Sequence, residues 1–335
     1  MGQNVYLLLK LNRHIKSFRL KSLGIYLMHL FGKRYFGLFL DPVLACNLRC
    51  RMCYFSDPEK RKTMKGAFQR EDLVKLSDAL FHRALKLQIG CGAEPSVFQH
   101  NEDLIRLAKT KGIPYISMTT NANLFSEEDW LRLLEAGLDE VTLSVHGVTK
   151  ESYEYFMQGA SFEKFVESLR ILTTLKSQFP SFKVRLNYTV NKDNLEELSR
   201  FFEKFGSYRF DILQIRPIQK LGETDYHCFS WEELYVRYDA IIEKLKAECK
   251  IRQIICMAPN KNDLVKEENT DSMIQESTYC YVSPKSVWQS DFDWKNETYE
   301  TYARRVRLGR RLLGNVFRSK KSFDKGKRNL NYEIN

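Results

Sequence analysis

Hydrophobic and polar residues follow two alternating periodicities along this 335-residue chain. Short runs rich in branched and aromatic residues predict six strands, near Tyr35–Leu40, Ala84–Ile89, Pro114–Thr119, Glu140–Val145, Lys183–Val190 and Asp211–Ile215. The stretches between and after them predict helices near Arg70–Phe81, Glu102–Lys111, Glu127–Ala136, Phe162–Ser177, Asn194–Phe205 and Trp231–Glu248. Because strand and helix alternate, the strands should be parallel and joined by right-handed crossovers.

This order predicts an α/β fold, a partial (β/α)6 barrel of the TIM type, over residues 36–220. Residues 1–35 form a basic segment with a predicted amphipathic helix, and residues 304–335 a basic helix and tail. The alternation is lost after Glu248, so we expect residues 221–303 to form an irregular cap or extension. Chemistry in such a barrel belongs in the loops that follow the strands.

The charge of the chain is concentrated at its two ends. The net charge is +11, and 43% of the residues are hydrophobic, which excludes a disordered chain. Residues 1–40 carry seven bases and no acid, and residues 303–335 carry eleven bases and two acids, so residues 41–302 carry a net −5. Since the core is acidic, we expect no nucleic-acid partner.

The basic ends leave two interpretations open. A base interrupts the apolar residues of the N-terminal segment every few positions, so this segment should not span a bilayer. Both ends could pack on the barrel with their bases in solvent, or lie on an anionic membrane surface. Sparse cysteines and the lack of a signal-peptide pattern predict a cytoplasmic protein, with peripheral contact at the inner membrane face as the open alternative.

Three cysteines follow the first predicted strand in the spacing C-x3-C-x2-C, at Cys46, Cys50 and Cys53. They could be a buried helical stripe, but the segment follows Pro42 and polar residues interrupt it. A structural zinc site needs a fourth ligand, and none lies nearby at the usual spacing. Three thiolates on a four-iron cluster leave one iron open to a substrate or cofactor.

A C-x3-C-x2-C loop after the first strand of a βα repeat resembles the radical S-adenosylmethionine (radical SAM) enzymes, over residues 36–220. In that family SAM chelates the open iron, and an electron from the cluster cleaves SAM to a 5′-deoxyadenosyl radical that takes hydrogen from the substrate. The resemblance implies a [4Fe-4S] cluster held by Cys46, Cys50 and Cys53, SAM as second cofactor, and an electron donor such as flavodoxin or ferredoxin.

Three further positions resemble motifs of the same family. The turn 90–95, Gly-Cys-Gly-Ala-Glu-Pro, is similar to its Gly-Gly-Glu-Pro turn, with Ala93 in place of the second glycine. The resemblance implies that Glu94 binds the methionyl ammonium, and a carboxylate complements that charge. Similar motifs after the third and fourth strands place Asn121 and Ser144 at the SAM pocket.

Two departures from the family pattern concern the same pocket. His146 stands where the family more often has Asp, but a turn residue is the commoner role for such a histidine, so we assign no catalytic residue. The arginine that often pairs with the SAM carboxylate is missing near residues 156–158, so Arg185 or Arg216 would have to replace it.

The remaining cysteines, Cys228, Cys249, Cys256 and Cys280, are far apart and contain no C-x2-C pair. The region resembles a degenerate SPASM/twitch-like extension, and isolated buried thiols are its favoured interpretation. The sequence therefore predicts a radical SAM enzyme that acts on an unidentified peptide or cell-envelope metabolite. The alternative is a noncatalytic protein, stabilised by zinc or built as a membrane-surface scaffold.

Overall fold

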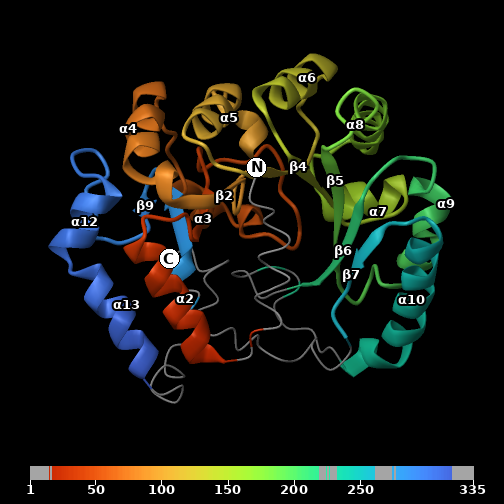
Figure 1. Cartoon of the computed structure of the whole chain (residues 1–335). Coiled ribbons are helices and arrows are strands. Elements are labelled where there is room, and N and C mark those ends of the chain that lie inside the picture. Colours follow the sequence, from red (N-terminus) through yellow and green to blue (C-terminus); the bar gives the residue numbers. More distant parts are fainter. Residues whose placement is uncertain are drawn as a thin grey trace.

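The computed structural model describes residues 15, 17–218, 224, 226, 232–260, 274 and 277–318 of the chain. Its strands are β1 (Phe36–Leu40), β2 (Ala84–Ile89), β3 (Ile116–Thr120), β4 (Glu140–Val145), β5 (Lys183–Val190), β6 (Ile212–Pro217), β7 (Ile255–Met257), β8 (Tyr279–Ser283) and β9 (Ser286–Val287). They form one sheet in the order β7-β6-β5-β4-β3-β2-β1-β8-β9, in which only β9 pairs antiparallel. The sheet curves into an open barrel (Figure 1).

Helices cover the outer face of this sheet. They are α2 (Phe18–Leu30), α3 (Pro58–Thr63), α4 (Arg70–Leu80), α5 (Asn101–Thr110), α6 (Glu127–Ala136), α7 (Lys150–Phe156), α8 (Phe162–Leu175), α9 (Phe201–Phe205), α10 (Glu232–Ile251), α12 (Tyr299–Arg305) and α13 (Leu308–Phe317). Short 3₁₀ turns are η1 (Tyr54–Ser56), η2 (Phe81–Arg83), η3 (Pro95–Val97) and η4 (Glu196–Arg200). Helices α4, α5, α6, α8 and α10 ring the barrel (Figure 1).

The predicted fold is confirmed, and β2, β4 and β5 begin and end where the sequence predicted. Two features of the structure differ from the prediction. The predicted helix 194–205 is a 3₁₀ turn, η4, followed by the short α9. The region predicted as an irregular extension supplies β7 and β8, which pair with β6 and β1 at opposite sides of the sheet. These strands have three and five residues and lack the repeated βα pattern, so the sequence did not predict them.

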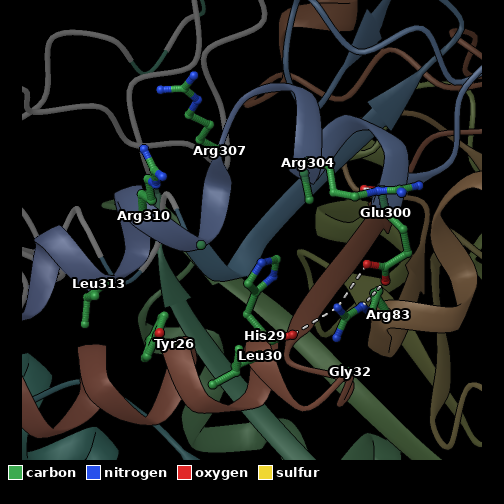
Figure 2. A pocket seen from close by; sticks show the side chains of 12 residues that line it. Tyr26, His29, Leu30, Gly32, Arg83, Glu300, Arg304, Arg307, Arg310 and Leu313 are labelled. Carbon is green, nitrogen blue, oxygen red and sulfur yellow. Dashed lines mark hydrogen bonds and ion pairs between the residues drawn. The ribbon is translucent and has the colours of Figure 1, made fainter.

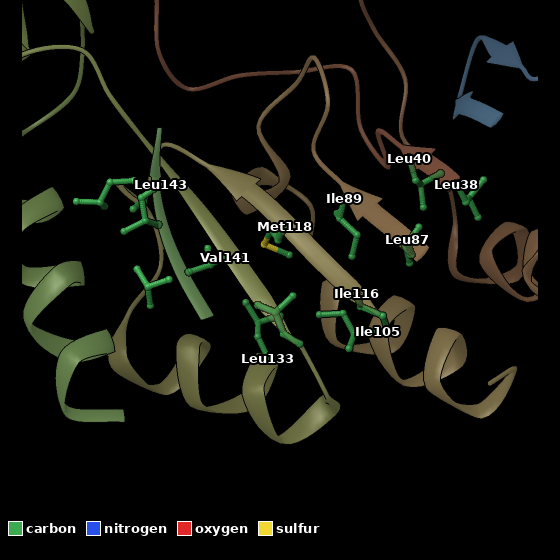
Figure 3. Close-up of a cluster of buried hydrophobic side chains, with 14 of the residues drawn as sticks. Leu38, Leu40, Leu87, Ile89, Ile105, Ile116, Met118, Leu133, Val141 and Leu143 are labelled. Atoms are coloured by element: carbon green, nitrogen blue, oxygen red, sulfur yellow. The ribbon is translucent and has the colours of Figure 1, made fainter. Parts of the chain in front are cut away.

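The hydrophobic core lies between the sheet and its outer helices. Alternate side chains of the strands point to this side, and those from β1 to β4 meet Ile105 of α5 and Leu133 of α6 (Figure 3). The strand members of this layer are Leu38, Leu40, Leu87, Ile89, Ile116, Met118, Val141 and Leu143, all fully buried. The intervening side chains therefore face the barrel interior, where several are polar.

The two basic ends of the described chain pack together. Helix α2 lies beside α13 (Figure 1), and Ile25 of α2 and Leu312 of α13 are buried in the main core. The predicted C-terminal helix begins earlier than residue 304, in α12, and is broken at Arg307, whose φ is 52°. None of the helices in the described residues combines the length and apolar run needed to cross a bilayer.

Candidate functional site

A cavity of about 220 Å³ opens at the carboxyl edge of the central strands. The loops after β1, β2, β3 and β4 all contribute to its wall. It is lined by all six residues that the sequence predicted for the site, which are Cys46, Cys50, Cys53, Glu94, Asn121 and Ser144. The structure thus brings together side chains that are separated by up to 98 positions in the sequence.

The cysteine loop has an irregular backbone held by the end of α7 and the loop that follows it. Residues 46–53 contain no helix, which excludes the buried helical stripe. The backbone N–H of Arg49 donates to the carbonyl of Gln158 (2.8 Å), and that of Arg51 to Phe156 (2.9 Å). The Arg51 guanidinium stacks on the ring of Tyr155, 4.1 Å from its centre. These contacts fix the loop over the cavity.

The three thiols are partly buried, and the chemistry of this donor set fits an iron–sulfur cluster. Burial raises the pKa of Cys46 to about 12 and also raises the pKa of Cys50 and Cys53. Binding of iron would therefore displace protons from the thiols. Within the described residues no group of three His, Cys, Asp or Glu side chains converges on a single metal ion. Cluster ligands bind different iron atoms and need no such convergence.

The carboxylate of Asp41, which directly follows β1, binds the backbone of the turn after β2. This carboxylate accepts hydrogen bonds from the backbone N–H groups of Cys91 (2.6 Å), Gly92 (3.0 Å) and Ala93 (3.3 Å). The Tyr281 hydroxyl donates to the same carboxylate (2.8 Å). Asp41 is 1% exposed, and burial raises its pKa against the opposing effect of these donors. The sequence analysis did not identify Asp41 or Tyr281.

Glu94 lies at the centre of the site and is 4% exposed. Its Oε1 accepts from the Ser96 N–H (3.0 Å) and the Thr120 hydroxyl (2.5 Å), and its Oε2 from the Asn121 N–H (2.8 Å). Burial raises the pKa of Glu94 despite these donors. A carboxylate oxygen can accept two hydrogen bonds, so Oε2 keeps one direction for a further donor such as an ammonium.

Asn121 connects the end of β3 to the cysteine loop. Its side-chain amide donates to Oδ1 of Asn47, between Cys46 and Cys50, at 2.8 Å. Asn47 was not among the predicted site residues. Because Asn121 also binds Glu94 through its backbone, it links the carboxylate to the loop that carries the thiols.

Polar residues of β5 and β6 line the opposite wall. Asn187 and Arg216 both border the cavity, and Oδ1 of Asn187 is buried with no hydrogen-bond partner among the described residues. Such an unsatisfied acceptor fits a polar ligand in this cavity. Arg185 instead forms an ion pair with Glu140 (2.7 Å), so of the two predicted carboxylate partners only Arg216 borders the cavity.

His146 also lines the cavity and is held in a neutral state. Its Nδ1 accepts a hydrogen bond from the Thr189 N–H (3.4 Å), and its backbone carbonyl accepts from the Asn194 amide (3.0 Å). Burial lowers the pKa of His146 to about 4. At neutral pH its other ring nitrogen therefore carries the proton and can donate a hydrogen bond.

Cys249, Cys256 and Cys280 of the C-terminal region do not line this cavity. Cys280 is buried in β8, and Cys228 lies outside the described residues. Cys249 and Cys256 are hydrogen-bonded to each other, so these two thiols are a pair rather than isolated as the sequence suggested. Their contact raises the pKa of Cys249 and lowers that of Cys256.

Comparison with known proteins identifies the same region. Residues 41–205 match the model of the Radical SAM superfamily. The chain is similar to a probable GTP 3′,8-cyclase of Metallosphaera sedula, 26% identical over 213 residues, which are 62% of this chain and 63% of that protein. It is also similar to a probable GTP 3′,8-cyclase of Saccharolobus islandicus, 23% identical over 67% of this chain and 70% of that protein.

Solved structures share the fold at low sequence identity. SuiB of Streptococcus suis, bound to S-adenosylmethionine, superposes with a TM-score of 0.59 and 16% identity, over 79% of this chain and 62% of SuiB. The protein anSMEcpe with bound AdoMet has a TM-score of 0.53 and 19% identity, over 66% of this chain and 63% of its own. The comparisons confirm the predicted family, its enzyme class and its cofactor pair. Residues 41–205 of the chain are therefore a Radical SAM domain, and the enzymes of that superfamily use a [4Fe-4S] cluster and S-adenosylmethionine.

Proposed function

We propose that this chain holds a [4Fe-4S] cluster through Cys46, Cys50 and Cys53 and uses SAM to abstract hydrogen from a substrate. The observation that supports the proposal best is the single cavity shared by these thiols, Glu94 and Asn121. When bound, the cluster supplies the electron that cleaves SAM to methionine and a 5′-deoxyadenosyl radical, which takes the hydrogen atom.

The residues of the chain position these cofactors. Three thiolates hold the cluster, and Glu94 accepts a hydrogen bond from the methionyl ammonium through Oε2. Ser144 and Asn187 offer hydrogen-bonding groups to the rest of SAM from the far wall. Apolar side chains that also line the cavity, among them Met52 and Ile218, exclude water from the reacting atoms.

The substrate proposed is a peptide or a cell-envelope metabolite. Similar proteins suggest which substrates to test: the structure of SuiB was also solved with the precursor peptide SuiA, and the cyclase relatives are named for GTP. We further propose a flavodoxin or ferredoxin as electron donor, and a cytoplasmic location with peripheral contact of the basic ends at the inner membrane face.

Anaerobic reconstitution with iron and sulfide, followed by incubation with SAM and a strong reductant, tests this function. We expect a brown protein that releases 5′-deoxyadenosine. Cys50→Ala should abolish the release, and Glu94→Gln should weaken SAM binding by about tenfold, the effect of losing one charged hydrogen bond. The matched control is Cys280→Ala, which removes a buried thiol outside the cavity.

The noncatalytic zinc alternative predicts the opposite result. A colourless protein that binds one zinc ion and releases no 5′-deoxyadenosine would replace the proposed enzyme by a zinc-stabilised binding protein. The retained release in Cys280→Ala separates loss of the site from general loss of folding.

A further inference from the structure

Helix α2 exposes an apolar stripe on the face opposite to its packed face. Ser22 and Ile25 are its buried residues. The exposed leucines Leu20, Leu23, Leu27 and Leu30 follow a spacing of three, four and three residues and are 60%, 37%, 39% and 58% exposed. This spacing places them on one helical face, about 150° from the buried one. A helix that only packs on a core would carry polar residues there.

Helix α13 extends the apolar surface. Leu313 is 37% exposed and Phe317 is 75% exposed, and α13 packs along α2 (Figure 1). Of fourteen large hydrophobic residues exposed in the described chain, eight belong to these two helices and their flanks: Ile15, Leu20, Leu23, Leu27, Leu30, Phe31, Leu313 and Phe317. We call these eight residues the α2–α13 apolar surface. A concentration of this kind marks an interaction site.

The charge around this surface has one sign. Residues 15–34 contain five bases and residues 301–318 contain six, and neither segment contains an acid. Some of these bases serve the fold, since Arg34 donates to the carbonyl of Phe81 (2.6 Å) and Arg305 pairs with Glu297 (2.7 Å). The side chains of Arg307 and Arg310 have no hydrogen-bond or ion-pair partner within the described residues.

A cavity of about 620 Å³ lies where the two helices meet. Tyr26 and Leu30 of α2 form one side, and Arg304, Arg307, Arg310 and Leu313 come from the other (Figure 2). Arg83 and Glu300 form an ion pair (2.6 Å) at one end, so the charge at that end is neutralised. The unpaired arginines therefore stand next to apolar side chains in one cavity.

We propose that the α2–α13 apolar surface docks on an anionic phospholipid bilayer, with the phosphate of a lipid headgroup held by Arg307 and Arg310. Apolar side chains beside bases are the composition of helices that lie in a membrane interface, and no helix of the described chain is suited to span one. A guanidinium binds phosphate oxygens in pairs of hydrogen bonds. The excess of bases around this surface complements anionic lipid and gains no electrostatic attraction from a neutral bilayer. This inference deepens the proposed peripheral contact and does not depend on the radical reaction.

Flotation of the full chain with vesicles tests the proposal. The vesicles contain phosphatidylcholine alone or with about 30% phosphatidylglycerol, at about 0.1 M and about 0.5 M salt. We expect binding to the anionic vesicles at least about tenfold stronger than to neutral ones, and weaker binding at high salt. Equal binding to both vesicle types, or no binding to either, would overturn the proposal.

Two pairs of variants identify the surface. Arg307→Gln with Arg310→Gln, and Leu27→Ser with Leu30→Ser, should each reduce binding to anionic vesicles about tenfold. The matched controls, Lys75→Gln with Lys204→Gln for charge and Ile251→Ser with Ile255→Ser for exposed apolar residues, should bind like the unaltered chain. Unchanged binding in both surface variants would contradict the assigned residues.

Binding partners of the exposed α2 leucines other than a bilayer would give different results in these experiments. Self-association that is lost in the Leu27→Ser/Leu30→Ser variant, without vesicle binding, would assign the stripe to a second copy of the chain. Vesicle binding that appears only after removal of residues 1–14 would assign it to that segment, and both results would overturn the proposal. Release of 5′-deoxyadenosine without vesicles should be the same in all four variants. Failure of membrane docking is thereby distinguished from failure of the proposed reaction.

Discussion

Tyr281 donates a hydrogen bond of 2.8 Å to the carboxylate of Asp41, across 240 positions of sequence. Asp41 is the acceptor for three N–H groups of the turn that ends in Glu94. Tyr281 belongs to β8, which pairs with β1 from the C-terminal region. Strand β8 therefore extends the sheet, and its Tyr281 also stabilises the turn of the proposed SAM site through Asp41.

Replacement of Asp41 should loosen this turn. Asp41→Asn exchanges one acceptor oxygen for an NH₂ group that faces the backbone donors, so we expect SAM affinity to fall by about tenfold. Tyr281→Phe removes a single hydrogen bond and should change the affinity by less than about threefold. Equilibrium dialysis of SAM against the reconstituted protein measures both. Wild-type affinity in Asp41→Asn would contradict this positioning role.

Gly90 is required by the backbone of the same turn. Its φ is +74°, and a Cβ built on it would lie 2.4 Å from the Thr119 carbonyl oxygen and 2.8 Å from Cδ of Pro95. We expect Gly90→Ala to abolish SAM binding in dialysis and to lower the unfolding midpoint in urea. Gly24→Ala is the control, since nothing lies within 4 Å of its added Cβ in helix α2. That variant should be stabilised by up to about 1 kcal/mol.

The buried His146 predicts how stability depends on pH. Its pKa is about 4 in the folded chain against 6.5 for an exposed histidine, because burial disfavours the charged ring. The contribution of neutral His146 to the free energy of unfolding is complete above pH 6.5. It is lost as the pH falls toward 4, by up to about 3 kcal/mol. We expect the free energy of unfolding, measured in urea from pH 7 to pH 4, to fall less steeply for His146→Gln than for the unaltered chain. Parallel curves for the two proteins would contradict a neutral buried His146.

The ion pair of Arg83 and Glu300 should stabilise the attachment of the terminal helices. The Arg83 side chain is 3% exposed and also donates to the carbonyls of His29 (3.1 Å) and Lys33 (2.9 Å) at the end of α2. Glu300 is 47% exposed, so we expect Glu300→Gln to cost about 1–2 kcal/mol, less than a fully buried pair. Urea unfolding measures this cost.

The control for that variant is Glu163→Gln, which breaks an exposed pair with Lys150. Its unfolding midpoint should match that of the unaltered chain because solvent screens exposed pairs. An equal loss of unfolding free energy in both variants would show that the burial of Arg83 does not strengthen its ion pair with Glu300.

Much of this architecture was predictable because it is encoded in local patterns. Strand β4 has its predicted bounds since its branched residues are contiguous, and α6 begins after Ser126, whose capping box with Asp129 is local. The six predicted site residues also share one cavity, because each lies at or just after the carboxyl end of a parallel strand and these strand ends meet at one edge.

The parts that sequence did not predict depend on distant partners. Asp41 precedes a proline and resembles an ordinary turn residue, since its hydrogen-bond partners lie 50 and more positions away. The sequence could not show which of Arg185 and Arg216 borders the cavity, because both occupy positions that face the barrel interior on neighbouring strands. The ion pair with Glu140 and a hydrogen bond to Gln214 hold Arg185 in the barrel wall.

The proposed function requires that three thiolates leave one iron of the cluster open for SAM. Electron paramagnetic resonance of the anaerobically reconstituted, dithionite-reduced protein tests it most directly, with spectra recorded before and after SAM is added. We predict a [4Fe-4S]⁺ signal whose g values shift on addition of SAM, and in Glu94→Gln the same shift should need about tenfold more SAM. A signal that SAM leaves unchanged, or a protein that retains zinc and gives no signal, would contradict the account.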